Sequence, residues 1–252
     1  VDTRIGTLNF KYGMPNQETI EKVYDYIDFG RAVDVYLNTL PGVSMWTNRK
    51  GQRDAGVPDN TLLTMEENMD ATGMYLTPNT VTPQTWLFLD LKKGPLVFEA
   101  PPKILGPVND MWFRYVCDIG YAGPDQGKGG KYLFLPPGYK GEIQSSGYFV
   151  FHSPTYGLWA PFRNFAVGGD VTQALESMRK NTRIYLLSEA DKPHEMLPNK
   201  NGSYLEINTV PPNNYLFWEY LNNLVQEEPA GSFGPEVTGQ MRSIGIKKGK
   251  AF

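Results

Sequence analysis

The strongest constraint on the fold of this chain comes from a series of short segments, in the middle of the sequence, that have the periodicity of β-strands. In residues 111–119, which read MWFRYVCDI, apolar side chains occupy every second position. This period of two is typical of a strand that packs one face on a core. Apolar segments of similar length occupy residues 85–91, 95–100, 131–135, 147–153 and 182–188. Together these segments predict antiparallel β-structure at the centre of the chain.

Turn residues between the segments predict how some of them connect. Lys92-Lys93-Gly94 separates the segments 85–91 and 95–100, so we expect a hairpin there. Residues 154–167 also alternate, but they contain Pro161, which cannot donate a hydrogen bond to a neighbouring strand. We therefore expect residues 154–167 to form an edge strand or a bent strand.

Segments with the periodicity of a helix lie on both sides of the strands. Residues 16–40 carry apolar side chains at helical spacing after a capping Asn16, and Pro41-Gly42 then predicts the end of the helix. We expect one kinked helix or two short ones in this range. Further helices are predicted over residues 171–180, after a capping Asp170, and over residues 214–226 and 235–245.

The order of these elements indicates an α+β fold, with an antiparallel β-sandwich core and helices before and after it. We divide the chain into an N-terminal helical segment (1–42), a β-sandwich domain (43–195) and a C-terminal helical segment (196–252). Residues 43–84 are irregular and rich in Asn, Thr, Gly and Pro. A loop of that length is unusual inside a domain, so we expect short strands within it.

Charge and composition exclude several classes of protein. The chain has 24 Lys and Arg against 27 Asp and Glu, and its net charge of −3 is not typical of a nucleic-acid-binding protein. Its single cysteine, Cys117, excludes an intramolecular disulfide and a zinc site built from cysteines. No run approaches the roughly 18 apolar residues of a membrane span. We therefore expect neither a nucleic-acid partner nor a membrane span.

Two loops share features with ligand-binding motifs without matching them. Residues 123–130 are rich in glycine, but their spacing fits neither a phosphate-binding P-loop nor a dinucleotide fingerprint. Residues 188–196 bring three carboxylates close to His194, but the spacing fits neither an EF-hand loop nor a zincin helix. A turn and a solvated acidic loop are the better interpretations. We therefore predict no cofactor and no metal site.

The most suggestive set of polar residues lies on the predicted sheet. Arg114 and Asp118 share the face of their strand that is opposite the apolar side chains. Arg163 lies close in sequence to Tyr156 and Trp159. An arginine between aromatic rings suits a carboxylate, a sulfate or a sugar, so these residues are candidates for binding a small anionic or sugar ligand. The alternative is a structural Arg–Asp pair buried where strands meet.

His152 is a candidate of a different kind, because it lies beside Ser153 at the end of a predicted strand. A Ser-His-Asp triad needs a histidine as its base, and its members need not be close in sequence. We therefore take His152 and Arg163 as the candidate catalytic residues, and we add His152 to the candidate ligand-binding residues. The alternative is a histidine that only completes a strand end or lies on the surface.

Four segments of the chain resemble a known family. They are residues 29–45 (FGRAVDVYLNTLPGVSM), 123–142 (GPDQGKGGKYLFLPPGYKGE), 153–193 (beginning SPTYGLWAPFRNFAV) and 226–252 (beginning QEEPAGSFGPEVTGQMRS). They resemble the mainly bacterial proteins of domain of unknown function 1254, which is usually followed by domain of unknown function 1214. The resemblance implies an immunoglobulin-like β-sandwich with helical segments, joined to a C-terminal jelly-roll-like domain. It implies a periplasmic or secreted location, and it brings no reaction and no cofactor.

The resemblance also shows where this chain departs from the family. His152 stands where members tend to carry an arginine, which weakens an anion site at that position, whereas Arg163 falls on the arginine of the family. The chain stops where the jelly-roll-like domain would begin, so it would be a fragment, a split version or one piece of a cleaved protein. The predicted C-terminal helices would then expose an apolar face around Phe217, Tyr220 and Leu224 that calls for a partner or a self-contact.

We therefore expect the N-terminal half of an exported two-domain protein that works in binding or assembly. Its expected partners are the jelly-roll-like domain, in the same or a separate chain, and further copies of this chain in a homo-oligomer. The alternative is a hydrolase-like enzyme that acts on a small ester, amide or glycan, at a site shared with the missing domain. That enzyme would bring Arg114, Asp118, His152 and Arg163 into one pocket.

Overall fold

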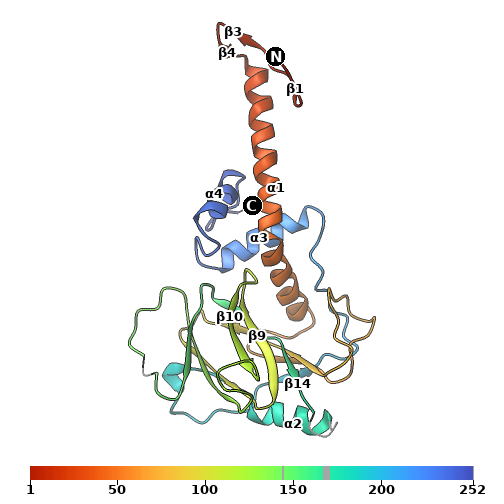
Figure 1. The fold of residues 1–252 in the computed structure, drawn as a ribbon, viewed down its shortest axis with the longest axis vertical. Coiled ribbons are helices and arrows are strands. Elements are labelled where there is room, and N and C mark those ends of the chain that lie inside the picture. The colour runs from red at the N-terminus through yellow and green to blue at the C-terminus, as the bar shows by residue number, and fades with distance from the viewer. Residues whose placement is uncertain (144, 167–170, 252) are drawn as a thin grey trace.

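The computed structural model describes residues 1–143, 145–166 and 171–251, so that Asp170, the expected helix cap, lies outside the described residues. The molecule has a body of β-sheets from which one long helix projects (Figure 1). This helix, α1 (Gln17–Asp54), has the N-terminus of the chain near its far end and the sheets near its other end. The helix α2 (Val171–Asn181) lies at the opposite end of the body.

The larger sheet has the strand order β16-β5-β6-β14-β9-β13-β7, and β10 also pairs with β9. Two segments of the chain that run along this sheet are each broken into two short strands. One segment forms β6 and β7, and the other forms β13 and β14. The strands are β5 (Leu62–Met65), β6 (Gln84–Trp86), β7 (Phe88–Asp90), β9 (Ile104–Asp110), β10 (Tyr115–Gly120), β13 (Gly157–Trp159), β14 (Phe162–Asn164) and β16 (Asn199–Asn201).

The smaller sheet has the order β12-β11-β8-β15. Its strands are β8 (Leu96–Ala100), β11 (Gly130–Leu135), β12 (Phe149–His152) and β15 (Arg183–Leu186). Side chains of both sheets, among them Leu89 and Leu158 of the larger sheet and Phe98 and Phe134 of the smaller, share one buried apolar core. Removing this apolar surface from water holds the two sheets together.

The pairing is mixed rather than wholly antiparallel. The pairs β11–β12 and β5–β16 are parallel, whereas the other described pairs are antiparallel. The fold therefore contains both helices and sheets, as expected, and an immunoglobulin-like strand order stays a prediction.

The hairpin expected around Lys92-Lys93-Gly94 is wrong, because β7 and β8 belong to different sheets and the chain crosses between the sheets there. The hairpin of this region is formed by β9 and β10 instead. Its turn falls on residues 111–114, inside the segment that was expected to be one strand. The buried carboxylate of Asp110 holds this turn, because it accepts hydrogen bonds from the backbone N–H groups of Trp112 and Arg114, both at 2.8 Å.

The described part of the segment 154–167, residues 154–166, does bend, but its strands do not lie at an edge of the sheet. Pro161 separates β13 from β14, and both strands pair with β9 on one side. On the other side β13 pairs with β7 and β14 pairs with β6. Pro161 is tolerated in this central position because it falls in the break between the two short strands, where the ladder is already interrupted.

The helix α1 does not end at Pro41-Gly42 but continues to Asp54. Pro41 is exposed, whereas Gly42 and the residues after it are buried in the body. A Cβ atom at position 42 would lie 2.5 Å from Cε3 of Trp112, so this glycine permits a close contact rather than a helix end. Tertiary packing here overrides the local signal. The domain boundary expected after residue 42 falls inside this helix, and residues 43–54, expected to be irregular, are helical.

The helices α3 (Leu216–Glu227) and α4 (Pro235–Ser243) form where the sequence predicts them and lie against α1 (Figure 1). Short strands β1 (Asp2–Thr3), β2 (Gly6–Thr7), β3 (Phe10–Lys11) and β4 (Met14–Pro15) form small hairpins at the far end of α1, and a 3-10 turn, η1, spans Leu187–Glu189. Within the described residues, no helix combines the length and the apolar character that a membrane crossing needs.

Candidate functional site

Arg114 and Asp118 do not form the pair that the sequence suggested. Arg114 lies in the β9–β10 turn, where its Nε donates to Oδ2 of Asp110 at 2.7 Å and its Nη2 donates to the carbonyl oxygen of Ser232 at 2.8 Å. Asp118 lies in β10 and accepts a hydrogen bond from the hydroxyl of Tyr115 at 3.0 Å. Arg114 therefore joins the turn to the segment between α3 and α4, which is a structural task.

The other candidate residues lie on separate elements. His152 is exposed at the end of β12 in the smaller sheet, and Arg163 is exposed in β14 of the larger sheet. Tyr156 precedes β13, and its backbone N–H donates to Glu228 at 2.5 Å. Trp159 is half-buried in β13 among other aromatic rings. In the described chain, none of the five main cavities is lined by Arg114, Asp118, His152 or Arg163.

The charged residues that do meet form a cluster that the sequence did not predict. This charged cluster consists of Arg49, Arg53, Asp59, Glu227 and Glu228. Arg49 is 1% exposed, and its Nε and Nη2 donate to the two carboxylate oxygens of Asp59 at 3.0 and 2.6 Å. Its Nη1 reaches Glu227 at 3.2 Å, and Arg53 bridges the same two carboxylates at 2.8 and 3.1 Å. The cluster joins α1, the loop before β5 and the C-terminal end of α3.

The pKa values of the carboxylates in the charged cluster are shifted in different directions. The pKa values of Asp59 and Glu227 are lowered because, although burial acts to raise them, hydrogen bonds and charges from Arg49 and Arg53 act more strongly. Burial raises the pKa of Glu228 to about 7, although Arg49 and the N–H groups of Tyr156 and Gly157 act to lower it. Carboxylates and guanidinium groups here bind each other, so the cluster fixes α1 to the body.

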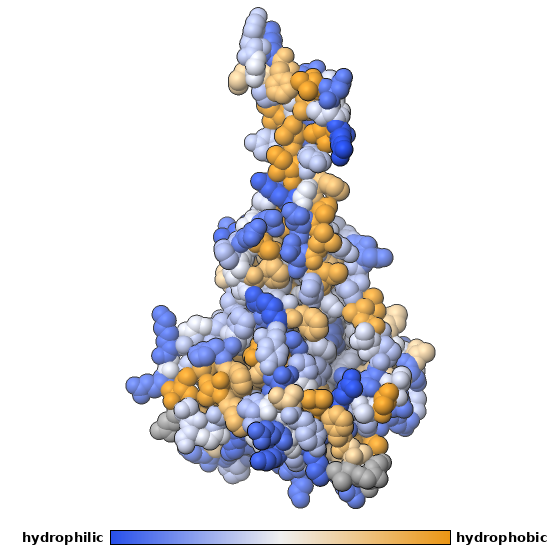
Figure 2. All heavy atoms as spheres, viewed as in Figure 1, coloured by the Kyte–Doolittle hydropathy of each residue, from blue (hydrophilic) through white to orange (hydrophobic). Residues whose placement is uncertain are grey.

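The candidate functional surface is the part of α1 that leaves the body. We call residues 17–40 the projecting arm. Phe29 is 68% exposed and Leu37 is 62% exposed, and no other described helix or sheet lies beside most of this length (Figure 1). The exposed large apolar side chains of the arm are Tyr24, Tyr26, Ile27, Phe29, Val33, Leu37 and Leu40. Figure 2 shows this apolar surface along the narrow part of the molecule.

One face of the arm continues an interface that the body already contains. Tyr26, Phe29, Val33, Tyr36 and Leu40 follow each other at alternating steps of three and four residues, which places them along one side of a helix. Near the body this side is covered by α3, where the ring of Tyr36 lies 4.5 Å from that of Phe217 and 6.3 Å from that of Trp218. Beyond Tyr36 the same side is uncovered.

The apolar face that was expected on α3 and α4 is not exposed, which corrects the sequence analysis. Phe217 is 1% exposed and Leu224 is fully buried, and both pack with Val43 and Trp46 of α1. Tyr220 is half-buried. The sequence placed the uncovered surface on the C-terminal helices, whereas it lies on the helix that they partly cover. The signal was present, because apolar residues occupy more than one side of residues 17–40.

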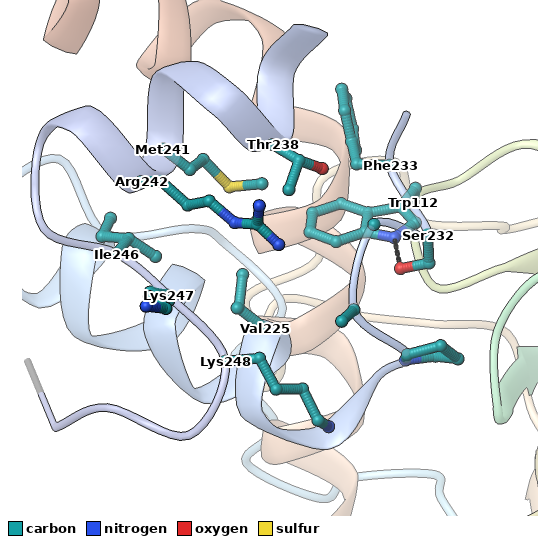
Figure 3. Close-up of a pocket in the computed structure, with 13 residues that line it drawn as sticks. Trp112, Val225, Ser232, Phe233, Thr238, Met241, Arg242, Ile246, Lys247 and Lys248 are labelled. Carbon is teal, nitrogen blue, oxygen red and sulfur yellow. Dashed lines mark hydrogen bonds between the residues drawn. The ribbon is translucent and has the colours of Figure 1, made fainter. Parts of the chain in front are cut away.

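A cavity between α3 and α4 is too small for a substrate. It lies over Trp112, whose Nε1 donates to Oγ of Ser232 at 2.8 Å (Figure 3). Its volume of about 20 Å³ is close to the space that one water molecule occupies. In the acidic loop 188–196, the ring of His194 stacks on that of Tyr185 at 3.6 Å. Nowhere among the described residues do three potential metal ligands of the His, Cys, Asp or Glu type meet.

Comparisons with known proteins place the chain in a family and support the fold. The family described as "Protein of unknown function (DUF1254)" has a sequence model that matches residues 60–186. The chain is similar in structure to the VPA0106 protein from Vibrio parahaemolyticus, with 17% identity and a TM-score of 0.62 over 89% of this chain and 53% of that one. The chain thus spans about half the length of that protein. No curated protein matches the chain.

Proposed function

The chain belongs to the DUF1254 family of proteins of unknown function, and from this premise we propose that it works as a binding and assembly module that docks through its projecting arm. The observation that carries this proposal is the exposure of aromatic and aliphatic side chains along residues 17–40. Soluble monomers rarely expose large contiguous apolar patches, and those that do generally use them for contacts.

The pattern of the arm favours a partner that covers more than one side. Tyr24 and Tyr26 are both more than half exposed, although residues two apart point to different sides of a helix. A helix that is apolar on several sides is normally buried among other elements. The arm also carries five carboxylates against two cations, so the rim of a covering surface would be basic.

We propose that the arm is covered by a second folded domain, in the same or in a separate polypeptide. The similar Vibrio protein has about as much chain again outside the matched part, which leaves room for such a domain. The family resemblance suggests that this domain is jelly-roll-like. Export to the periplasm or out of the cell stays a prediction from the same resemblance.

A second copy of this chain is the other partner to test as a cover for the arm. The three-and-four spacing from Tyr26 to Leu40 is the pattern of a helix that pairs with another helix. Two arms alone would leave the remaining apolar side of each arm in water, and both arms are acidic. These two features favour the domain over the second copy, and a homo-oligomer stays a prediction.

The hydrolase hypothesis gains no support from the geometry. His152 and Arg163 lie in different sheets, and neither lines a main cavity of the described chain. Arg114 is engaged with Asp110 and Ser232. A small anionic ligand at these residues stays a prediction.

Oxidative footprinting inside cells that express the protein naturally tests the docking proposal. Hydroxyl radicals label exposed aromatic and sulfur-containing side chains, so the purified chain should be labelled at Tyr26 and Phe29. We expect strong protection of both residues in the cell. Tyr204 and Met196, which are exposed outside the arm, serve as matched controls and should be labelled in both settings.

Equal labelling of the arm in cells and in dilute purified protein would show that nothing covers it and would contradict the proposal. Protection that also develops in the purified chain as its concentration rises would identify a second copy as the occupant. Sedimentation velocity on the same samples would then show the corresponding increase in mass, and Phe29→Ser should abolish it.

A further inference from the structure

A cavity beside the charged cluster has the properties of a site for a small uncharged molecule. It lies between α1 and the larger sheet, and its volume is about 300 Å³. This volume is at the lower end of the range found for small-molecule pockets. The wall residues that matter here are Ser44, Asn48, Tyr75, Trp86, Phe113 and Trp159. The site is separate from the projecting arm, so this inference does not depend on the docking proposal.

Aromatic rings form most of the wall. The ring of Trp86 lies 5.6 Å from that of Tyr75 and 6.3 Å from that of Trp159, edge to face in both cases. The ring of Phe113 lies 6.0 Å from that of Trp159 and closes another side. Aromatic walls of this kind stack on flat rings and on the C–H faces of sugars.

The polar groups of the wall are neutral, and several are hydrogen-bond donors. Asn48 is buried, and its Oδ1 accepts from Nε2 of Gln52 at 3.2 Å, while no described residue accepts from its amide nitrogen. The indole N–H groups of Trp86 and Trp159 are buried, and they also have no acceptor among the described residues. Because almost no surface of these indole nitrogens is accessible, they do not face the open cavity, and the amide of Asn48 is the donor that a ligand oxygen would meet.

Among the residues that the structure describes, no charged side chain lines this cavity. A charged ligand would lose its hydration without gaining an ion pair, which is strongly unfavourable. The wall therefore selects against a small anion, which is one of the two ligand classes that the sequence suggested, and favours an uncharged molecule.

The backbone of Phe113 supplies an independent observation. Its φ angle is +62°, a left-handed conformation that is rare and strained for a bulky residue. The side chain is nevertheless 49% exposed at the tip of the β9–β10 turn, where an apolar ring gains little from burial. Glycine or asparagine would fit this turn better. A strained, half-exposed aromatic ring at the rim of a cavity supports a role in contacting a ligand.

We propose that this cavity binds an uncharged ring-shaped ligand that carries hydroxyl or carbonyl oxygens, either a sugar or a small phenol. The ring packs against the rings of Phe113 and Trp159, and a ligand oxygen accepts a hydrogen bond from the amide of Asn48. Trp159 was a candidate from the sequence for binding a small anionic or sugar ligand, and this cavity favours the uncharged class.

Nuclear magnetic resonance of the indole N–H groups tests the proposal on the whole chain. The protein has five tryptophans, so the spectrum should hold five indole signals, two of which come from the cavity wall. Titration with methyl glucoside or with p-cresol should shift the signals of Trp86 and Trp159 and leave that of Trp218 in place. The two probes distinguish a sugar from a phenol. Methyl glucuronide and 4-methylbenzoate, the charged counterparts, should bind at least about tenfold more weakly.

Two variants separate binding from stability. Phe113→Gly relieves the strained backbone, so the melting temperature should not fall, but the affinity should drop by roughly three- to tenfold. Asn48→Ala should also weaken binding. Tyr204→Gly is the matched control, because Tyr204 is an exposed aromatic residue at positive φ outside the cavity, and it should leave affinity unchanged. The proposal is overturned if neither probe shifts both indole signals, if the charged counterparts bind equally well, or if Phe113→Gly retains full affinity.

Discussion

The two halves of α1 belong to one continuous helix but lie in opposite environments. From Gln17 to Leu40 most side chains face water, and from Gly42 to Gln52 nearly all are buried. Both halves contain apolar residues and arginines at helical spacing. The difference arises from what covers them, because α3, α4 and the larger sheet cover the second half, whereas in the first half α3 and α4 reach only residues near its end, such as Val35 and Tyr36. A helical pattern thus identifies a helix without identifying which part of it meets the core.

Removing an arginine from each half should give the largest contrast. Arg49→Met leaves Asp59 and Glu227 with fewer partners in the charged cluster, so we expect a loss of about 3–5 kcal/mol in the free energy of unfolding. Arg31→Met removes only an exposed pair with Asp28 at 3.1 Å, so we expect a change below about 1 kcal/mol. Urea denaturation of both variants measures the contrast. Similar losses in the two variants would show that the buried cluster does not fix the helix.

The pH dependence of stability should report the charged cluster, which fixes the buried half of α1 to the body. Glu228 has a pKa of about 7 in the folded protein and an ordinary value of 4.5, so between these pH values the folded state holds a proton that the unfolded state has lost. The free energy of unfolding should therefore fall as the pH rises through this window, by up to roughly 3 kcal/mol. Below the window it should fall again as the pH drops, because the pKa values of Asp59 and Glu227 are lowered.

The variant Glu228→Gln should remove most of the slope between pH 4.5 and 7, since an amide does not titrate. The parent protein should keep the full slope. Urea denaturation at several pH values gives both slopes. A slope that survives in Glu228→Gln would assign the proton to another group.

A glycine in each half should respond with opposite sign to the same substitution. Gly42→Ala would bring a methyl group to 2.5 Å from Trp112, so we expect a loss of about 1–3 kcal/mol. Gly30→Ala meets nothing within 4 Å and improves helix propensity, so we expect a gain of about 0.5–1 kcal/mol. Thermal unfolding of the two variants is sufficient, and a loss in Gly30→Ala would mean that the arm is packed in solution.

The smallest effect is expected for an apolar residue of the arm. Leu37→Ser should change the stability of the isolated chain by less than about 0.5 kcal/mol, because its side chain already faces water. Leu221→Ser, in the face of α3 that packs on α1, should be strongly destabilising by comparison. If Leu37→Ser were as costly as Leu221→Ser, the arm would not be exposed.

Local sequence patterns correctly predicted those helices and strands whose packing in the structure agrees with the pattern. The helices α2, α3 and α4 and the strands β11 and β15 lie within a few residues of their expected positions. Prediction was wrong where tertiary contacts outweighed local ones. Pro41 does not end α1, because the following residues pack in the body, and the 111–119 segment is split by a turn that the carboxylate of Asp110 holds.

The sites were harder to predict than the elements, because they depend on distant residues. Arg49 and Glu227 are far apart in the sequence and meet only through the packing of α3 on α1. Trp159 was a candidate, yet its neighbours in the cavity come from α1, from the loop after β5 and from the β9–β10 turn. A structural Arg–Asp pair was the alternative that the sequence offered for Arg114, and in the structure Arg114 pairs with Asp110 rather than with Asp118.

The continuity of α1 through Pro41 has a mechanical consequence. The 24 helical residues of the arm extend about 36 Å. A force applied near Asn16 therefore acts through a lever arm of that length on the point where the helix enters the body. Torque at that point is resisted by the bidentate Arg49–Asp59 contact and by the apolar packing of α3. A partner bound at the N-terminal end of α1 would therefore be held at a fixed angle to the sheets, and a tilt of that partner would also tilt the sheets.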